Sequence, residues 1–135
     1  MKSAASTALL CALALTACDD GKPIVLNSVS TASPSGEWKA VIEEVDNGLG
    51  FGQGALYEEV HVVKANEQAT THGDAGQSVV FYAESMYEKG SRINIKWLSA
   101  NKLQILHDHA QKPGKHLQNY RGITLEVTPN PTVAK

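Results

Sequence analysis

The sequence has few cysteines and no concentration of basic charge, and each shortage excludes a class of function. Only two cysteines occur in 135 residues, and both lie at or before position 18. The remaining chain can therefore form neither a disulfide nor a zinc–thiolate site. The 12 basic residues are scattered and are outnumbered by 14 acidic ones. Because binding to phosphates needs a concentrated basic face, nucleic acid is not an expected partner.

Long apolar runs are also lacking, apart from one at the N-terminus. About 16 residues, rich in alanine and leucine, separate Lys2 from Asp19. A membrane-spanning helix needs roughly 20 apolar residues, so this run is short for a span. Its length, with one basic residue before it, is typical of a secretory signal peptide.

The end of this run holds a motif. The residues Leu15-Thr16-Ala17-Cys18 resemble the bacterial lipobox, in which small residues precede a cysteine. The resemblance implies that 1–17 is a lipoprotein signal peptide and that Cys18, carrying a covalent diacylglycerol, is the first mature residue. It implies a periplasm-facing protein held at a membrane. Asp19 matches the residue that retains enteric lipoproteins at the inner membrane, so that membrane is expected in preference to the outer one.

The mature chain is divided by its pattern into three parts. Residues 18–32 are small and polar and predict a tether, although Ile24–Leu26 is also consistent with a short edge strand. Residues 33–128 predict a β-domain that opens with the turn sequence Ser33-Pro-Ser-Gly36. Residues 129–135 predict a flexible tail.

Period-two alternation of apolar residues predicts about six strands in this domain. They are expected over 37–45, 56–65, 78–84, 92–99, 101–109 and 122–129, with a turn at 111–115. Hairpin-like connections favour an all-β fold, an antiparallel sheet folded as a small barrel or sandwich. The expected core residues are Trp38, Val41 or Ile42, Val60, Val62, Val80, Tyr82, Ile93, Ile95, Trp97, Leu103, Ile105, Ile123 and Leu125.

A glycine-rich stretch interrupts the strands. Glycines alternate with Leu49, Phe51 and Gln53 between positions 48 and 54. No Lys-Ser/Thr pair follows, which excludes a phosphate cradle of the P-loop kind. Two interpretations remain open. The stretch is either a loop that presents the three side chains to a partner, or a glycine-lined strand that allows another backbone to approach closely.

Candidate metal-binding and catalytic residues are few. His107 and His109 share one face of a strand and flank Asp108, which gives a metal-binding or hydrolytic alternative without a recognised motif. The adjacent pairs Glu43-Glu44 and Glu58-Glu59 can each supply one carboxylate to a given face. We expect all four on a solvated surface, balanced across strands by the lysines Lys39, Lys64 and Lys96.

Several segments of the mature part, at 33–63, 79–87 and 93–105, look like those of small proteobacterial lipoproteins of unknown function. The resemblance supports the compartment and the fold and adds no catalytic residue. We therefore expect a non-enzymatic, membrane-anchored periplasmic module. It would need no cofactor besides its lipid and would bind an envelope protein, as inhibitor and immunity lipoproteins do. The alternative is a metal-binding or hydrolytic domain that uses His107, Asp108 and His109.

Overall fold

The computed structural model describes residues 23–48, 56–69, 77–84, 92–108 and 111–130. Within these ranges the chain is all β and forms nine strands. The predicted fold class is therefore confirmed, with three more strands than expected. The strands are β1 (Ile24–Ala32), β2 (Trp38–Asp46), β3 (Leu56–Lys64), β4 (Val79–Glu84), β5 (Asn94–Ser99), β6 (Lys102–His107), β7 (Lys112–His116), β8 (Asn119–Tyr120) and β9 (Ile123–Pro129).

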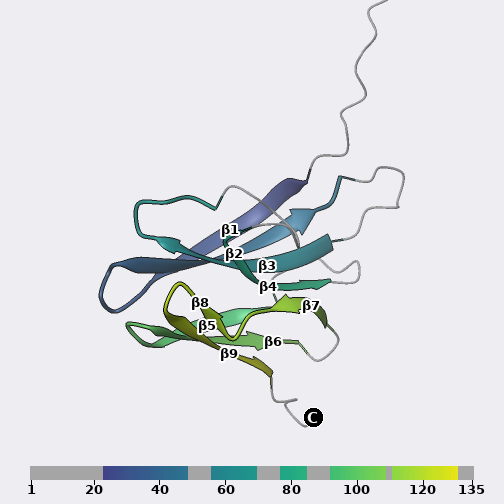
Figure 1. The fold of residues 1–135 in the computed structure, drawn as a ribbon. Helices are drawn as coiled ribbons and strands as arrows, with labels where there is room; N and C mark the ends of the chain where they lie inside the picture. The colour runs from purple at the N-terminus through teal and green to yellow at the C-terminus, as the bar shows by residue number, and fades with distance from the viewer. Residues whose placement is uncertain (1–22, 49–55, 70–76, 85–91, 109–110, 131–135) are drawn as a thin grey trace, which may run out of the picture.

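The strands form two sheets that stack face to face (Figure 1). The larger has the order β1-β2-β3-β4-β7 and the smaller the order β5-β6-β9-β8. All neighbouring strands are antiparallel except β6 and β9, which run parallel. Of the two architectures that the sequence left open, the structure is a sandwich and not a closed barrel. In the described ranges, no helix has the length and apolar character needed to cross a membrane.

The hydrophobic core lies between the sheets and contains most of the predicted residues. Its buried members are Trp38, Ala40, Ile42, Val60, Val62, Val80, Phe81, Ala83, Ile93, Trp97, Leu103, Ile105, Ile123 and Leu125. The Trp97 indole N–H also donates to the Thr31 carbonyl at 3.0 Å, which ties the smaller sheet to β1. Tyr82 is half-buried and packs against the Tyr57 ring on the opposite face of the larger sheet. Phe81 takes the core position instead.

The predicted turn before β2 is present. The Ser33 backbone N–H donates to the Trp38 carbonyl at 2.8 Å, and the Ser33 hydroxyl accepts the Trp38 N–H at 3.2 Å. Gly36 has a φ of 71°, in the left-handed region that suits glycine. The turn is thus followed directly by β2, which begins at Trp38. Lys64 Nζ lies over the Trp38 ring, 3.9 Å from its centroid.

The chain enters the sheet earlier than residue 33. Residues 24–32 form β1, which pairs with β2 from Ile24↔Asp46 to Ala32↔Lys39. The second half of the predicted tether is therefore an edge strand. The alternative prediction of a short edge strand at Ile24–Leu26 has the right kind of element, but the strand is nine residues long. Every residue of β1 is exposed, and its sequence IVLNSVSTA lacks the apolar alternation by which six of the strands were predicted.

The predicted turn at 111–115 is also wrong in part, because 112–116 forms β7 at the other edge of the larger sheet. Pro113 has no N–H to donate, and an edge strand tolerates this loss. A Cβ added to Gly114 would lie 2.8 Å from Tyr82 Cδ1. Glycine therefore allows β7 to pass close to the Tyr82 ring.

We predict that Gly114→Ala lowers the free energy of unfolding by roughly 1–2 kcal/mol, because the added methyl group meets the Tyr82 ring. Urea unfolding followed by circular dichroism measures this. In a Tyr82→Ala background the same change should cost little or nothing, since the obstructing ring is gone. An equal loss in both backgrounds would contradict the steric explanation.

Candidate functional site

Most of the residues singled out from the sequence lie outside the described ranges, namely Cys18, Asp19, Leu49, Phe51, Gln53 and His109. His107 is described and is buried. Its Nδ1 donates to the Asp108 carbonyl at 2.9 Å, and its ring lies 5.5 Å from the Phe81 ring, centroid to centroid.

The structure corrects the expectation for the four glutamates of β2 and β3. They do not form a solvated surface, because Glu43 and Glu44 are 7% exposed and Glu58 and Glu59 are fully buried. The alternation rule itself holds. Glu43 stands directly opposite Glu59, and Glu44 directly opposite Glu58, so each face of the strand pair carries one carboxylate from each strand.

On the core side, Glu58 is held by residues that stand just before two strands. The Arg92 backbone N–H donates to both Glu58 carboxylate oxygens, at 2.9 and 3.1 Å. The Gln111 side-chain amide donates to Glu58 Oε2. Arg92 precedes β5 and Gln111 precedes β7, so this carboxylate fixes the entry of the chain into both strands. Its role is therefore structural.

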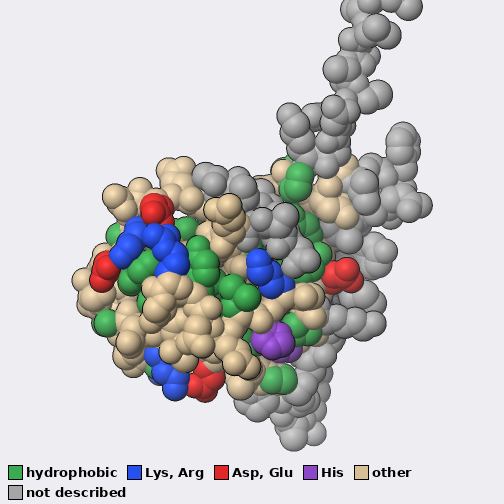
Figure 2. Space-filling view, in the orientation of Figure 1, with side chains coloured by type: hydrophobic (Ala, Val, Ile, Leu, Met, Phe, Trp, Pro, Cys, Tyr) green, Lys and Arg blue, Asp and Glu red, His purple; other side chains and the backbone are tan. Residues whose placement is uncertain are grey.

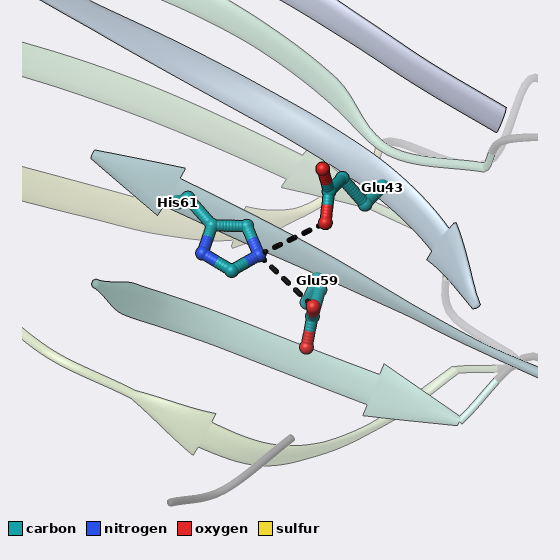
Figure 3. A group of neighbouring side chains, drawn as sticks. All are labelled: Glu43, Glu59 and His61. Atoms are coloured by element: carbon teal, nitrogen blue, oxygen red, sulfur yellow. Dashed lines mark hydrogen bonds and ion pairs between the residues drawn. The ribbon is translucent and has the colours of Figure 1, made fainter. Parts of the chain in front are cut away.

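On the outer face, Glu43, Glu59 and His61 converge (Figure 3). His61 Nε2 lies 2.9 Å from Glu59 Oε1 and 3.4 Å from Glu43 Oε2. The other ring nitrogen, Nδ1, lies 2.8 Å from the Ser78 hydroxyl. Within the described part of the chain, this is the one group of three side chains whose ligating atoms all lie within 4.8 Å of one another.

The electrostatics of the group favour a charged imidazole. Burial lowers the pKa of His61, but the hydrogen bonds and negative charges of Glu43 and Glu59 outweigh it and raise the pKa to about 9. Burial, and then the nearby carboxylates, raise the pKa of Tyr57 far above its usual value. At neutral pH both His61 nitrogens therefore carry hydrogen, Nε2 facing the carboxylates and Nδ1 facing Ser78.

The contacts of His61 resemble a Ser-His-Glu triad in distance but not in protonation. A general base must accept the hydroxyl proton, and a ring that is already protonated at neutral pH has no lone pair to do so. While the ring is protonated, Ser78 therefore orients it and is not activated by it. The arrangement is suited to holding a positive charge between two carboxylates.

A pocket reaches this group from the side of β1. It has a volume of about 250 Å³ and is lined by Ser28, Ser30, Lys39, Val41, Glu43, Gln68 and Ala69. Ser28 Oγ lies 3.5 Å from Glu43 Oε1, so the edge strand forms one wall. Of the three converging side chains, Glu43 is the one that lines the pocket.

The edge strand β1 is a second candidate. Four of its apolar side chains are between 39% and 56% exposed, namely Ile24, Val25, Leu26 and Val29. The strand contains no charged residue and no proline. On the face shown in Figure 2, the charged side chains of the described residues stand singly or in small groups rather than in a large patch of one charge.

The sequence contained part of the signal for the Glu43–Glu59–His61 group. Period two places His61 on the face of Glu59, and a β2–β3 hairpin with glycines between the strands brings Glu43 opposite. What it could not show is that this outer face is buried. Charged pairs on strands are usually solvated, so the burial had to come from the structure.

Comparison with known proteins adds no identification. No protein-family model matches the chain, and neither a curated protein nor a solved structure is significantly similar to it.

We predict that stability depends on pH through His61. Because its pKa rises from 6.5 unfolded to about 9 folded, its contribution is complete below pH 6.5 and is lost as the pH rises through 9. The full effect is on the order of 3 kcal/mol. Denaturant unfolding between pH 6 and 10 should show wild type losing its advantage over His61→Gln.

The exposed His116 of β7 provides the control, and His116→Gln should follow the wild-type pH profile. A difference between wild type and His61→Gln that stays constant from pH 6 to 10 would contradict the prediction. It would mean that the ring is neutral in the folded protein.

Proposed function

We propose that this protein is a lipid-anchored, non-enzymatic module of the cell envelope that binds another protein by adding a strand at β1. The partner supplies an extended, uncharged segment with apolar side chains on one face. The observation that carries the proposal is the nine-residue edge strand, exposed along its whole length. Strand addition satisfies the backbone groups of such an edge, and side-chain contacts give selectivity.

The contrast among the edges of the sandwich supports β1 as the binding edge. Edge strands usually carry features that prevent pairing with other chains. Among the described strands, β7 contains Pro113 and Lys115, β5 contains Lys96, and β8 has only two residues. The sequence of β1, IVLNSVSTA, has none of these features. A long uncharged edge is a liability that a dedicated partner would explain.

The side chains of β1 indicate what the partner would contact. Val29 stands opposite Ile42, a core residue, so its side chain points to the core face of the sheet. It is nevertheless 50% exposed, which means that the core is incomplete at this edge. An apolar side chain from an added strand would lie beside Val29 and continue the core, as in a neighbouring pair within the sheet.

The position of β1 in the chain agrees with a partner at the membrane. Six positions separate Cys18 from Ile24, which is at most roughly 20 Å of extended chain. If Cys18 carries the lipid, β1 is held close to the bilayer surface. An anchored module of this kind meets other envelope proteins at high local concentration, so a modest interface is sufficient.

We predict that Cys18→Ser abolishes acyl labelling and moves the protein from the membrane to the soluble fraction of cells. The lipid is attached through the cysteine sulfur, and serine provides none. Metabolic labelling with a fatty-acid analogue and fractionation of the envelope measure both effects. Cys11→Ser is the matched control and should keep label and partition. Continued labelling of Cys18→Ser would contradict the lipobox interpretation.

Strand addition at β1 is tested in living cells by placing a photo-crosslinking residue at Val29, with the lipid anchor intact. We expect one discrete adduct with another protein, because this side chain would lie beside the added strand. Leu98 of β5 is the control, since it is 43% exposed and belongs to the other sheet. The same residue placed there should give no such adduct.

Two results would count against the proposal. An adduct of twice the mass of the chain would show that a second copy occupies the edge. Equal labelling from positions 29 and 98, or none from either, would show that β1 is not a binding edge.

A further inference from the structure

We propose that Glu43, Glu59 and His61 form a binding site for a divalent first-row transition metal ion, for which zinc is the probe. The three side chains project from the middle of β2 and β3 onto one buried face (Figure 3). This inference does not depend on strand addition at β1.

The separations of the donor atoms agree with a metal ion between them. Zinc bonds to imidazole nitrogen and carboxylate oxygen are about 2.0–2.2 Å, so neighbouring ligands of a tetrahedral ion lie roughly 3.4 Å apart. His61 Nε2 and Glu43 Oε2 are 3.4 Å apart, and His61 Nε2 and Glu59 Oε1 are 2.9 Å apart. An ion would thus replace the Nε2 hydrogen after the Glu59 carboxylate moves by about half an ångström.

The outer contact of the ring is the one that a metal-binding histidine requires. Such histidines usually donate the N–H of their second nitrogen to a nearby acceptor, which fixes the tautomer and the ring orientation. Ser78 Oγ lies 2.8 Å from His61 Nδ1 and is available as that acceptor. With hydrogen on Nδ1, the lone pair on Nε2 points to Glu43 and Glu59. Ser78 is therefore a positioning residue.

The donor set indicates which class of ion would bind. Two carboxylates and a neutral imidazole carry a formal charge of −2, which a divalent cation balances. Magnesium and calcium prefer oxygen ligands alone, whereas imidazole suits zinc, copper, iron and nickel. The location on two neighbouring strands in the middle of a sheet also makes the site rigid.

The pocket beside Glu43 provides access and room for a further ligand. Its volume of about 250 Å³ greatly exceeds the space needed for one water molecule, and Ser28 and Ser30 line it with hydroxyl groups. Three protein ligands with an open fourth position are the arrangement of an accessible zinc site. Lys39 also lines the pocket, and with a neutral imidazole its ammonium and the two carboxylates sum to a formal charge of −1.

The experiment uses the full-length chain with Cys11 and Cys18 replaced by serine, so that no thiol competes for metal. Competition between the protein and a chromophoric zinc chelator measures affinity, and cobalt absorption reports the coordination geometry. We expect one zinc ion per chain and tetrahedral cobalt bands. His61→Gln and Glu43→Gln should each weaken binding by a hundredfold or more, since each removes a direct ligand.

Two further variants make the result specific. Ser78→Ala leaves all three ligands in place and should weaken zinc binding 10–100-fold, as the loss of an orienting hydrogen bond does. His116→Gln removes an exposed histidine of β7 and should have no effect. Circular dichroism confirms that each variant is folded. If zinc does not bind, or binds the His61→Gln variant as tightly as the parent, the three side chains are an ion-paired cluster and no metal site.

Discussion

Two directly opposed glutamate pairs in the middle of β2 and β3 are the constraint on which the larger sheet depends. Like charges facing each other across a strand pair are destabilising, and burial increases the cost. Glu44 and Glu58 face the core, while Glu43 and Glu59 face outward. The strands can pair in this register only if each face supplies hydrogen-bond donors or positive charge for its carboxylates.

The two faces meet this requirement in different ways. On the core side, Glu58 receives neutral donors, the Arg92 backbone N–H and the Gln111 amide, and these hold the starts of β5 and β7. On the outer face the donor is the His61 imidazole, which lies on the same strand as Glu59 two residues later. A backbone donor has a fixed charge and position. An imidazole can exchange its hydrogen for a metal ion, so the outer group is the one of the two that is suited to binding a ligand.

The same register explains which parts of the structure could be predicted from sequence. Period two placed Trp38, Ile105 and Leu125 in the core, because apolar side chains recur at alternate positions around them in their strands. It failed for β1, whose exposed residues leave no alternation, and for β7, where Pro113 and Gly114 are typical of a turn. Both segments become strands through pairing with a neighbour, β1 with β2 and β7 with β4. No local sequence pattern shows such backbone partners.

The candidate site was half predictable for a related reason. Alternation places one carboxylate of each glutamate pair on a common face, and the structure confirms that placement. The sequence could not show that both faces of β2 and β3 are buried. An antiparallel sheet covered on one side only can have the same glutamates on its solvated face, so the sequence pattern does not distinguish the two cases. His107, the histidine favoured by the sequence, is held by the Asp108 carbonyl, whereas His61 is the one flanked by carboxylates.

The two proposals have separate evidence but share β1. Ser28 and Ser30 of this strand line the pocket beside Glu43, and Val29 between them turns toward the core. A strand added to the free edge of β1 would restrict the movement of β1. It would therefore also restrict the movement of Ser28 and Ser30 in the wall of the pocket. If the added strand changes the affinity for the ion, the ion must change the affinity for the partner by the same factor, because coupling between two binding sites is reciprocal. The size of that coupling depends on how rigidly β2 holds β1. The backbone pairing of the two strands runs from Ile24 to Ala32 and is shifted once, between Val25 and Asn27. This pairing therefore determines how strongly the two sites are coupled.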